Sequence, residues 1–195
     1  MNKLKNYDLY FIHIPKNAGT SFILEFCESN IGHRKISDYD KKIWNKTIVI
    51  IRNPYTRLIS LYNYAKLDKS YWHSLDKSTK YGKHILYDYC NSHTFEEFII
   101  DLCVYNKFDN DRQYLHLLPQ FYWILTPEKK IVSKILRFSN LNEDIYNILN
   151  IDIKLKKINE SKTKNYNNYY TDITRQLVYN KYKLDFELFG PFQTI

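Results

Sequence analysis

The chain has 195 residues and a net charge of +8; 44% of its residues are hydrophobic, and it holds only 4 glycines and 5 prolines. This length predicts a single domain, residues 1–195, and the composition excludes disordered, low-complexity and fibrous proteins. The positive charge indicates an anionic partner, for which nucleic acid, a phosphorylated cofactor and an acidic glycan all qualify.

The N-terminus has no apolar signal segment, and no run of 18 apolar residues occurs anywhere. We therefore expect a soluble, cytoplasmic protein without a membrane span. The three cysteines, Cys27, Cys90 and Cys103, have no metal-binding spacing, so we expect them to be reduced and buried.

The first predicted element is a strand over residues 8–14, DLYFIHI, which is apolar, aromatic and β-branched and ends at a proline. A loop, PKNAGTS, follows, and Thr20 or Ser21 is expected to cap a helix behind it. Helix N-termini present backbone N–H groups that suit a phosphate. We therefore assign phosphate binding to the seven residues of this loop: Pro15, Lys16, Asn17, Ala18, Gly19, Thr20 and Ser21.

A second strand-to-helix turn follows at residues 47–64. The β-branched run at 47–51 is typical of a parallel strand covered on both faces. Asn53 is expected to cap the next helix and Pro54 to be its first residue. Arg52 then lies at the carboxyl end of a strand, where open α/β sheets bind ligands. Together these elements predict an α/β domain with a central parallel sheet flanked by helices.

The later elements are read from shorter patterns. Thr94 and Glu97 form a capping box that starts a helix over 94–105. We also predict an ILRF strand within 129–141, a helix at 142–149, a solvated lysine-rich loop at 154–164 and a last helix at 172–186. The polar stretch 66–93, with His73, His84 and His93, is expected to be a mobile loop that shapes an acceptor site; a plain surface insertion is the equal alternative.

The two turns resemble the signature motifs of the carbohydrate O-sulfotransferases, sulfotransferase family 2, which use 3′-phosphoadenosine 5′-phosphosulfate (PAPS). HIPKNAGTS at 13–21 is similar to the family's HIPKTAGTS, and RNPYTRLISLY at 52–62 is similar to RNPYDRLVSAY. Looser similarity continues along the chain: TFEEF at 94–98, LLPQ at 117–120, RFSNL at 137–141 and YKLDFELFG at 182–190.

The resemblance implies a PAPS-dependent O-sulfotransferase with a P-loop-like phosphate site, no metal, the bisphosphate PAP as product and a hydroxyl acceptor, expected to be a glycan. It implies that Lys16 contacts the phosphosulfate, that the loop through Ser21 cradles the 5′-phosphate, and that Arg52 and Ser60 hold the 3′-phosphate. A nucleotide kinase is the enzyme alternative, but a Walker A loop has its lysine after the last glycine. A basic nucleic-acid-binding protein is the non-enzyme alternative, and it leaves the paired motifs unexplained.

The resemblance also implies a histidine base, which we assign to His33 in the crossover between the two motifs; imidazole suits this role near neutral pH. A surface-loop histidine is the alternative interpretation. His116 either faces the acceptor or is a satisfied structural histidine. His13 is expected to pack beneath the phosphate site, and Glu25 to be a solvated helix residue.

Overall fold

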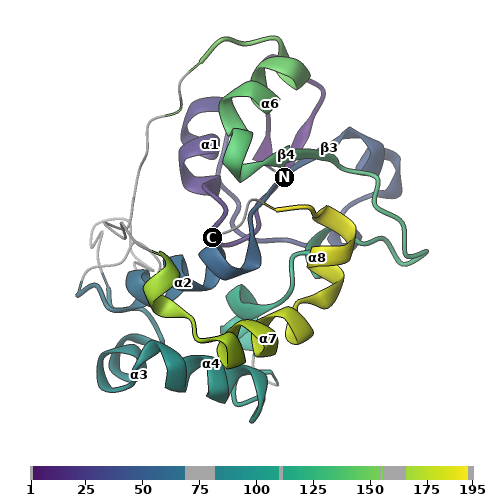
Figure 1. The fold of residues 1–195 in the computed structure, drawn as a ribbon. Coiled ribbons are helices and arrows are strands. Elements are labelled where there is room, and N and C mark those ends of the chain that lie inside the picture. Colours follow the sequence, from purple (N-terminus) through teal and green to yellow (C-terminus); the bar gives the residue numbers. More distant parts are fainter. Residues whose placement is uncertain (1, 69–81, 110–111, 154, 156–165, 193–195) are drawn as a thin grey trace. The chain divides into compact units, whose positions relative to one another are not determined.

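The structure, a computed structural model, describes residues 2–68, 82–109, 112–153, 155 and 166–192. The chain forms two compact units, the first from residues 1–53, 118–160 and 184–193 and the second from 54–117, 161–183 and 194–195. The strands are β1 (Asn2–Lys3), β2 (Tyr10–Ile12), β3 (Thr47–Ile51) and β4 (Lys134–Arg137). The α-helices are α1 (Gly19–Phe26), α2 (Pro54–Ala65), α3 (Tyr87–Ser92), α4 (Phe95–Cys103), α5 (Phe121–Ile124), α6 (Leu141–Leu149), α7 (Asp172–Lys181) and α8 (Lys183–Phe189) (Figure 1).

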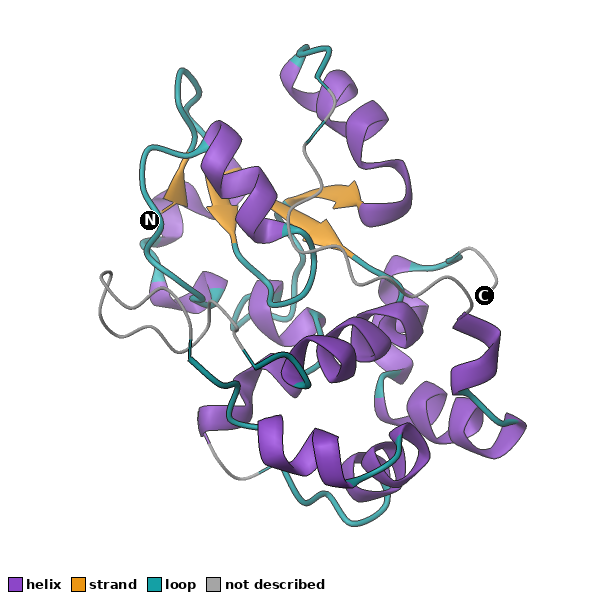
Figure 2. Ribbon diagram, turned by 90° about the vertical axis from the view of Figure 1, so that its left-hand side faces the viewer, coloured by secondary structure: helices purple, strands orange, loops and turns teal. Residues whose placement is uncertain are grey.

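The first unit is built on a four-stranded sheet of order β1-β2-β3-β4, drawn in orange in Figure 2. β2, β3 and β4 are parallel, with Phe11 opposite Ile48 and Val49 opposite Ile135. The α/β class and the mostly parallel central sheet are thus confirmed. β1 pairs antiparallel to β2, which the sequence did not predict, and β2 is shorter than the predicted strand over 8–14.

Every residue of β3 is buried, and its side chains alternate between two apolar clusters. Ile48 and Ile50 pack in the cluster formed with α1 and α6, which lie over one face of the sheet (Figure 1). Val49 and Ile51 pack in the cluster formed with α5 and α8 on the other face. Each fully buried aliphatic side chain contributes about 1.5–3 kcal/mol to stability. β3 is therefore firmly anchored in the core of this unit, and so is the position of its carboxyl end.

The second unit contains α2, α3, α4 and α7. Thr94 caps α4 in the predicted capping box: its Oγ1 accepts from the N–H of Glu97 at 3.2 Å, and its own N–H donates to Glu97 Oε2 at 2.7 Å. Helix α3 occupies part of the stretch 66–93 that the sequence indicated as a loop, and that prediction is wrong there. Residues 69–81, including His73, lie outside the described part of the chain.

The C-terminal region departs from the predicted single helix at 172–186. It forms two helices, because the chain leaves helical geometry at Tyr182 between α7 and α8. The lysine-rich run 154–164 lies outside the described residues apart from Leu155. Over the described ranges, no helix is both long and apolar enough to cross a bilayer.

Candidate functional site

Two loops meet at one edge of the sheet because β2 and β3 are adjacent and parallel. Residues 15–18 follow β2, and Arg52 follows β3. The guanidinium of Arg52 lies against the first loop, with Nη1 donating to the carbonyl oxygen of Lys16 at 3.0 Å. The structure therefore brings Lys16 and Arg52, 36 residues apart in sequence, to one place at the carboxyl ends of neighbouring strands.

The loop after β2 has an unusual backbone. Lys16 and Ala18 have φ values of 68° and 61°, in the left-handed region that non-glycine residues rarely adopt. Such strained residues cluster at ligand-binding sites. Ala18 is the N-cap of α1 and its carbonyl accepts from Phe22 at 3.2 Å, so the predicted capping by Thr20 or Ser21 is wrong. The N–H groups of the first turn, residues 19–21, precede the helical hydrogen-bond ladder and form the positive end of α1.

The electrostatics of Lys16 are set by its surroundings. Burial, followed by the nearby positive charge of Arg52, lowers the pKa of Lys16 from 10.5 to about 7. Arg52 is itself 7% exposed, and its guanidinium carbon lies 4.2 Å from the centre of the Phe138 ring. Two neighbouring cations, Arg52 buried and Lys16 partly exposed, are costly without an anion between them, so this edge of the sheet suits an anionic ligand.

Asn17 differs from the other loop residues. Its side chain is 1% exposed and points inward, with Nδ2 donating to the carbonyl of Ile50 and to Oε1 of Gln120, both at 2.7 Å. Its amide holds the loop to β3, so only its backbone can face a ligand. The sequence had placed Asn17 with the ligand-binding residues and gave no sign of this inward orientation.

The ring of His13 packs so closely against position 19 that only glycine fits there. A Cβ atom added at Gly19 would lie 2.1 Å from Cδ2 of His13 and 2.3 Å from its Nε2. His13 is buried, as expected, and its ring stacks on Phe11. Burial, and then the neighbouring His33, lower the pKa of His13 well below 6.5, so this imidazole is neutral at physiological pH.

His33 lies beside His13, and their ring centres are 4.0 Å apart. Nδ1 of His33 is 2.7 Å from the carbonyl oxygen of His13. A carbonyl only accepts, so Nδ1 carries the proton and donates it. In the neutral ring the lone pair is then on Nε2, which is the state that a general base needs. The half-buried His33 thus has a fixed orientation and tautomer in the same unit as Lys16 and Arg52.

Two other predicted site residues belong to the second unit. Ser60 lies on α2 and is 8% exposed. His116 is 1% exposed, its ring lies 4.8 Å from that of His84, and its carbonyl accepts from Nη2 of Arg57 at 2.9 Å. This enclosure favours the structural interpretation of His116 over an acceptor-facing one.

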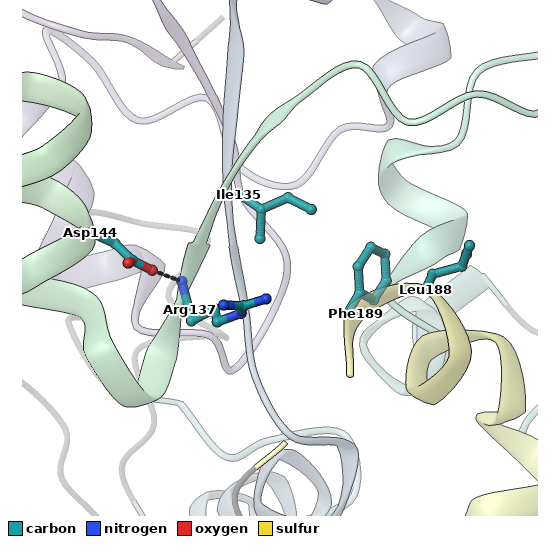
Figure 3. Close-up of a pocket in the computed structure, with 5 residues that line it drawn as sticks. All are labelled: Ile135, Arg137, Asp144, Leu188 and Phe189. Atoms are coloured by element: carbon teal, nitrogen blue, oxygen red, sulfur yellow. Dashed lines mark hydrogen bonds between the residues drawn. The ribbon is translucent and has the colours of Figure 1, made fainter. Parts of the chain in front are cut away.

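The close-up in Figure 3 shows a pocket beside β4, with a volume of about 230 Å³. It is lined by Ile135, Arg137, Asp144, Leu188 and Phe189. The N–H of Arg137 donates to Oδ2 of Asp144 at 2.5 Å, and the Arg137 side chain points to the same side as Phe189. Arg137 is opposite Ile51 in the sheet, so it adds a cation near the carboxyl edge that the sequence analysis did not assign.

Two site-supporting residues were missed. Gln120 and Asp185 are both fully buried. Gln120 bonds to both loops described above, and Asp185 bonds to the backbone of Gln120. The sequence showed LLPQ and YKLDFELFG as similar to a family, but no local pattern pairs Gln120 with a residue 103 positions away. Across the described ranges, no three His, Cys, Asp or Glu side chains are arranged to hold a metal ion.

Comparison with known proteins identifies one family. The model of the sulfotransferase family matches residues 3–193, nearly the whole chain. Neither the curated proteins nor the solved structures give a match.

Proposed function

Because the chain belongs to the sulfotransferase family, we propose that it transfers the sulfuryl group of PAPS to a hydroxyl of a carbohydrate acceptor. The observation that carries the proposal is the meeting of Lys16 and Arg52 at the carboxyl ends of β2 and β3, where Nη1 of Arg52 donates to the Lys16 carbonyl. Family membership supplies the sulfuryl chemistry, and this pair of cations supports an anionic nucleotide as the donor.

The donor's 5′-phosphosulfate is assigned to the loop of residues 15–18 and the first turn of α1. There the helix N-terminus offers N–H donors and a positive dipole, as P-loops do for phosphates. Arg52, with Ser60 as its proposed partner, binds the 3′-phosphate. Lys16 is positioned to stabilise negative charge on the leaving phosphate oxygen. When bound, PAPS supplies an activated sulfuryl group, and this proposal requires no metal.

The proposed base is His33. Its Nδ1–H is engaged by the His13 carbonyl, so Nε2 is the atom that accepts the proton of the acceptor hydroxyl. In the transfer, the bond from sulfur to the phosphate oxygen breaks, a bond from sulfur to the acceptor oxygen forms, and the proton goes to Nε2. The products are the sulfate ester and PAP, and His33 later releases its proton to solvent. In-line positioning and charge stabilisation are the needs that this reaction shares with phosphoryl transfer.

Thermal unfolding with added ligands tests the proposal. PAP should stabilise the protein without metal, and much more than AMP, which lacks the 3′-phosphate; at 100 times its dissociation constant a ligand adds about 2.7 kcal/mol. A nucleotide kinase would respond to ATP with magnesium, and a nucleic-acid-binding protein to an oligonucleotide. Equal stabilisation by AMP and PAP would remove Arg52 and Ser60 from the assigned role, and a response to ATP alone would overturn the proposal.

A further inference from the structure

A buried polar network joins four separate segments of the first unit. It consists of the amides of Asn17 and Gln120, the backbone of Arg52 and the carboxylate of Asp185. Asn17 belongs to the loop after β2, Arg52 follows β3, Gln120 precedes α5, and Asp185 is on α8. Asn17, Gln120 and Asp185 have side chains that are at most 1% exposed.

Gln120 is the centre of this network. Its Oε1 accepts from the N–H of Arg52 at 2.9 Å, and its Nε2 donates to the carbonyl of the same residue at 2.8 Å. The side-chain amide thus pairs with Arg52 as a neighbouring strand would, just beyond the end of β3. The same Oε1 also accepts from Nδ2 of Asn17 at 2.7 Å. The primary amide donates through its nitrogen and accepts through its oxygen at once, so both backbone groups of Arg52 are bonded.

Asp185 fixes Gln120 in turn. Its Oδ2 accepts from the backbone N–H of Gln120 at 2.7 Å, and its Oδ1 accepts from that of Phe121 at 2.8 Å. A carboxylate that accepts two N–H groups at the start of a helix makes strong, charge-assisted bonds. The amide of Gln120 therefore has little freedom to turn away from Arg52 and Asn17.

We propose that Gln120, held by Asp185, is a positioning residue. It fixes the position of Arg52 relative to the loop that contains Lys16, and so determines selectivity for a nucleotide with both a 5′- and a 3′-phosphate. The inference rests on the proposed function, because it takes the loop and Arg52 as the two ends of the donor site. Gln120 does not itself contact the ligand. The affinity of a ligand that contacts both the loop and Arg52 depends on the distance and orientation between them. The affinity of a ligand that contacts only the loop depends on them much less.

The test is the ratio of PAP to AMP affinity in Gln120→Met, which keeps the side chain's length and removes its hydrogen bonds. We expect PAP to bind about tenfold more weakly, because without the two bonds to Arg52 the ligand must itself order Arg52 against the loop, at a cost comparable to one or two net hydrogen bonds of about 0.5–1.5 kcal/mol each. AMP affinity should change less than about threefold, measured by calorimetry well below the melting temperature. Gln176→Met is the matched control, because Gln176 is exposed on α7 and its side-chain amide donates to Asn180 on the same helix; both affinities should be retained.

A second pair of variants decides the case if Gln120→Met does not fold. Gln120→Asn keeps the amide and shortens the side chain by one methylene group, so its hydrogen bonds to Arg52 should be weaker and the same PAP to AMP ratio should fall less than in Gln120→Met. Asp185→Asn should also lower the ratio, while Asp101→Asn, which alters a carboxylate on α4 that accepts from Nζ of Lys107, should not.

The outcomes separate the two proposals. If the melting temperature of the Gln120 and Asp185 variants falls and the ratio stays at the wild-type value, these residues only support the fold, and this inference is overturned while the proposed function stands. If the wild-type protein itself shows no preference for PAP over AMP, the proposed function fails, and this inference fails with it.

Discussion

Nδ1 of His33 donates to the carbonyl oxygen of His13 at 2.7 Å, and the two imidazole rings lie 4.0 Å apart. This hydrogen bond orients the His33 ring and also sets its tautomer. It assigns the proton to Nδ1 and the lone pair to Nε2, the arrangement that a proton-accepting histidine needs. His13, kept neutral by burial, places no second positive charge beside its neighbour.

His33→Ala should lower the turnover number by about 100- to 10,000-fold, the usual contribution of a general base, and should leave PAP affinity unchanged. In the wild-type enzyme with saturating PAPS, which keeps Lys16 charged, the turnover number should rise with pH in a single step to a plateau, because only the neutral imidazole accepts a proton. Turnover assays measure the turnover number, and calorimetry measures the PAP affinity. His116→Ala is the control: if it abolishes turnover and His33→Ala does not, the base has been assigned to the wrong histidine.

Gly19→Ala should destabilise the protein by about 1–3 kcal/mol, the usual cost of forcing an extra methyl group into a packed site. The new Cβ would lie 2.1 Å from Cδ2 of His13, so the His13 ring must move and the support of His33 with it. Chemical denaturation of a double-mutant cycle with His13→Ala measures the coupling. The double variant should recover part of the loss; additive effects would show that the contact with His13 is not the cause.

The sequence predicted β3 and the start of α2 to the residue, because a β-branched run followed by Asn-Pro is an unambiguous local signal. The capping box of α4 was equally local and is confirmed. The start of α1 was misplaced, since a left-handed Ala18 at the N-cap is a conformation that composition does not favour.

The supports of the site could not be predicted, because they depend on contacts between distant segments. Asn17 meets Gln120 across 103 positions, and Gln120 meets Asp185 across 65. Lys16 and Arg52 were proposed because the two motifs contain them, and His33 from the family resemblance, whereas the inward orientation of Asn17 depends on its contacts with β3 and Gln120. A single sequence therefore yields proposals for the residues that face a ligand more readily than for those that hold them in place.

Lys16→Ala should lower the turnover number by about 100-fold or more, the effect of losing a preorganised charge where negative charge develops. PAP affinity should fall less, since the loop backbone and Arg52 remain. Single-turnover rates with saturating PAPS measure the chemical step. If affinity alone fell and turnover persisted, Lys16 would anchor the nucleotide without acting in the reaction.

The pKa of Lys16 also predicts how PAP affinity depends on pH. With a pKa of about 7 in the ligand-free protein, Lys16 is largely neutral at pH 8.5, whereas an anion bound beside it stabilises the charged form and raises the pKa. Binding above pH 7 must then take up a proton, so PAP affinity should fall as pH rises from 7 to 9, by up to about tenfold over this range. Calorimetry in buffers of different ionisation enthalpy measures both the affinity and the proton uptake.

Lys16→Arg is the matched variant, because arginine stays charged over this range; its PAP affinity should be nearly constant from pH 7 to 9. A wild-type affinity that is equally constant would mean that Lys16 is already charged before PAP binds, and its burial would then not govern the binding.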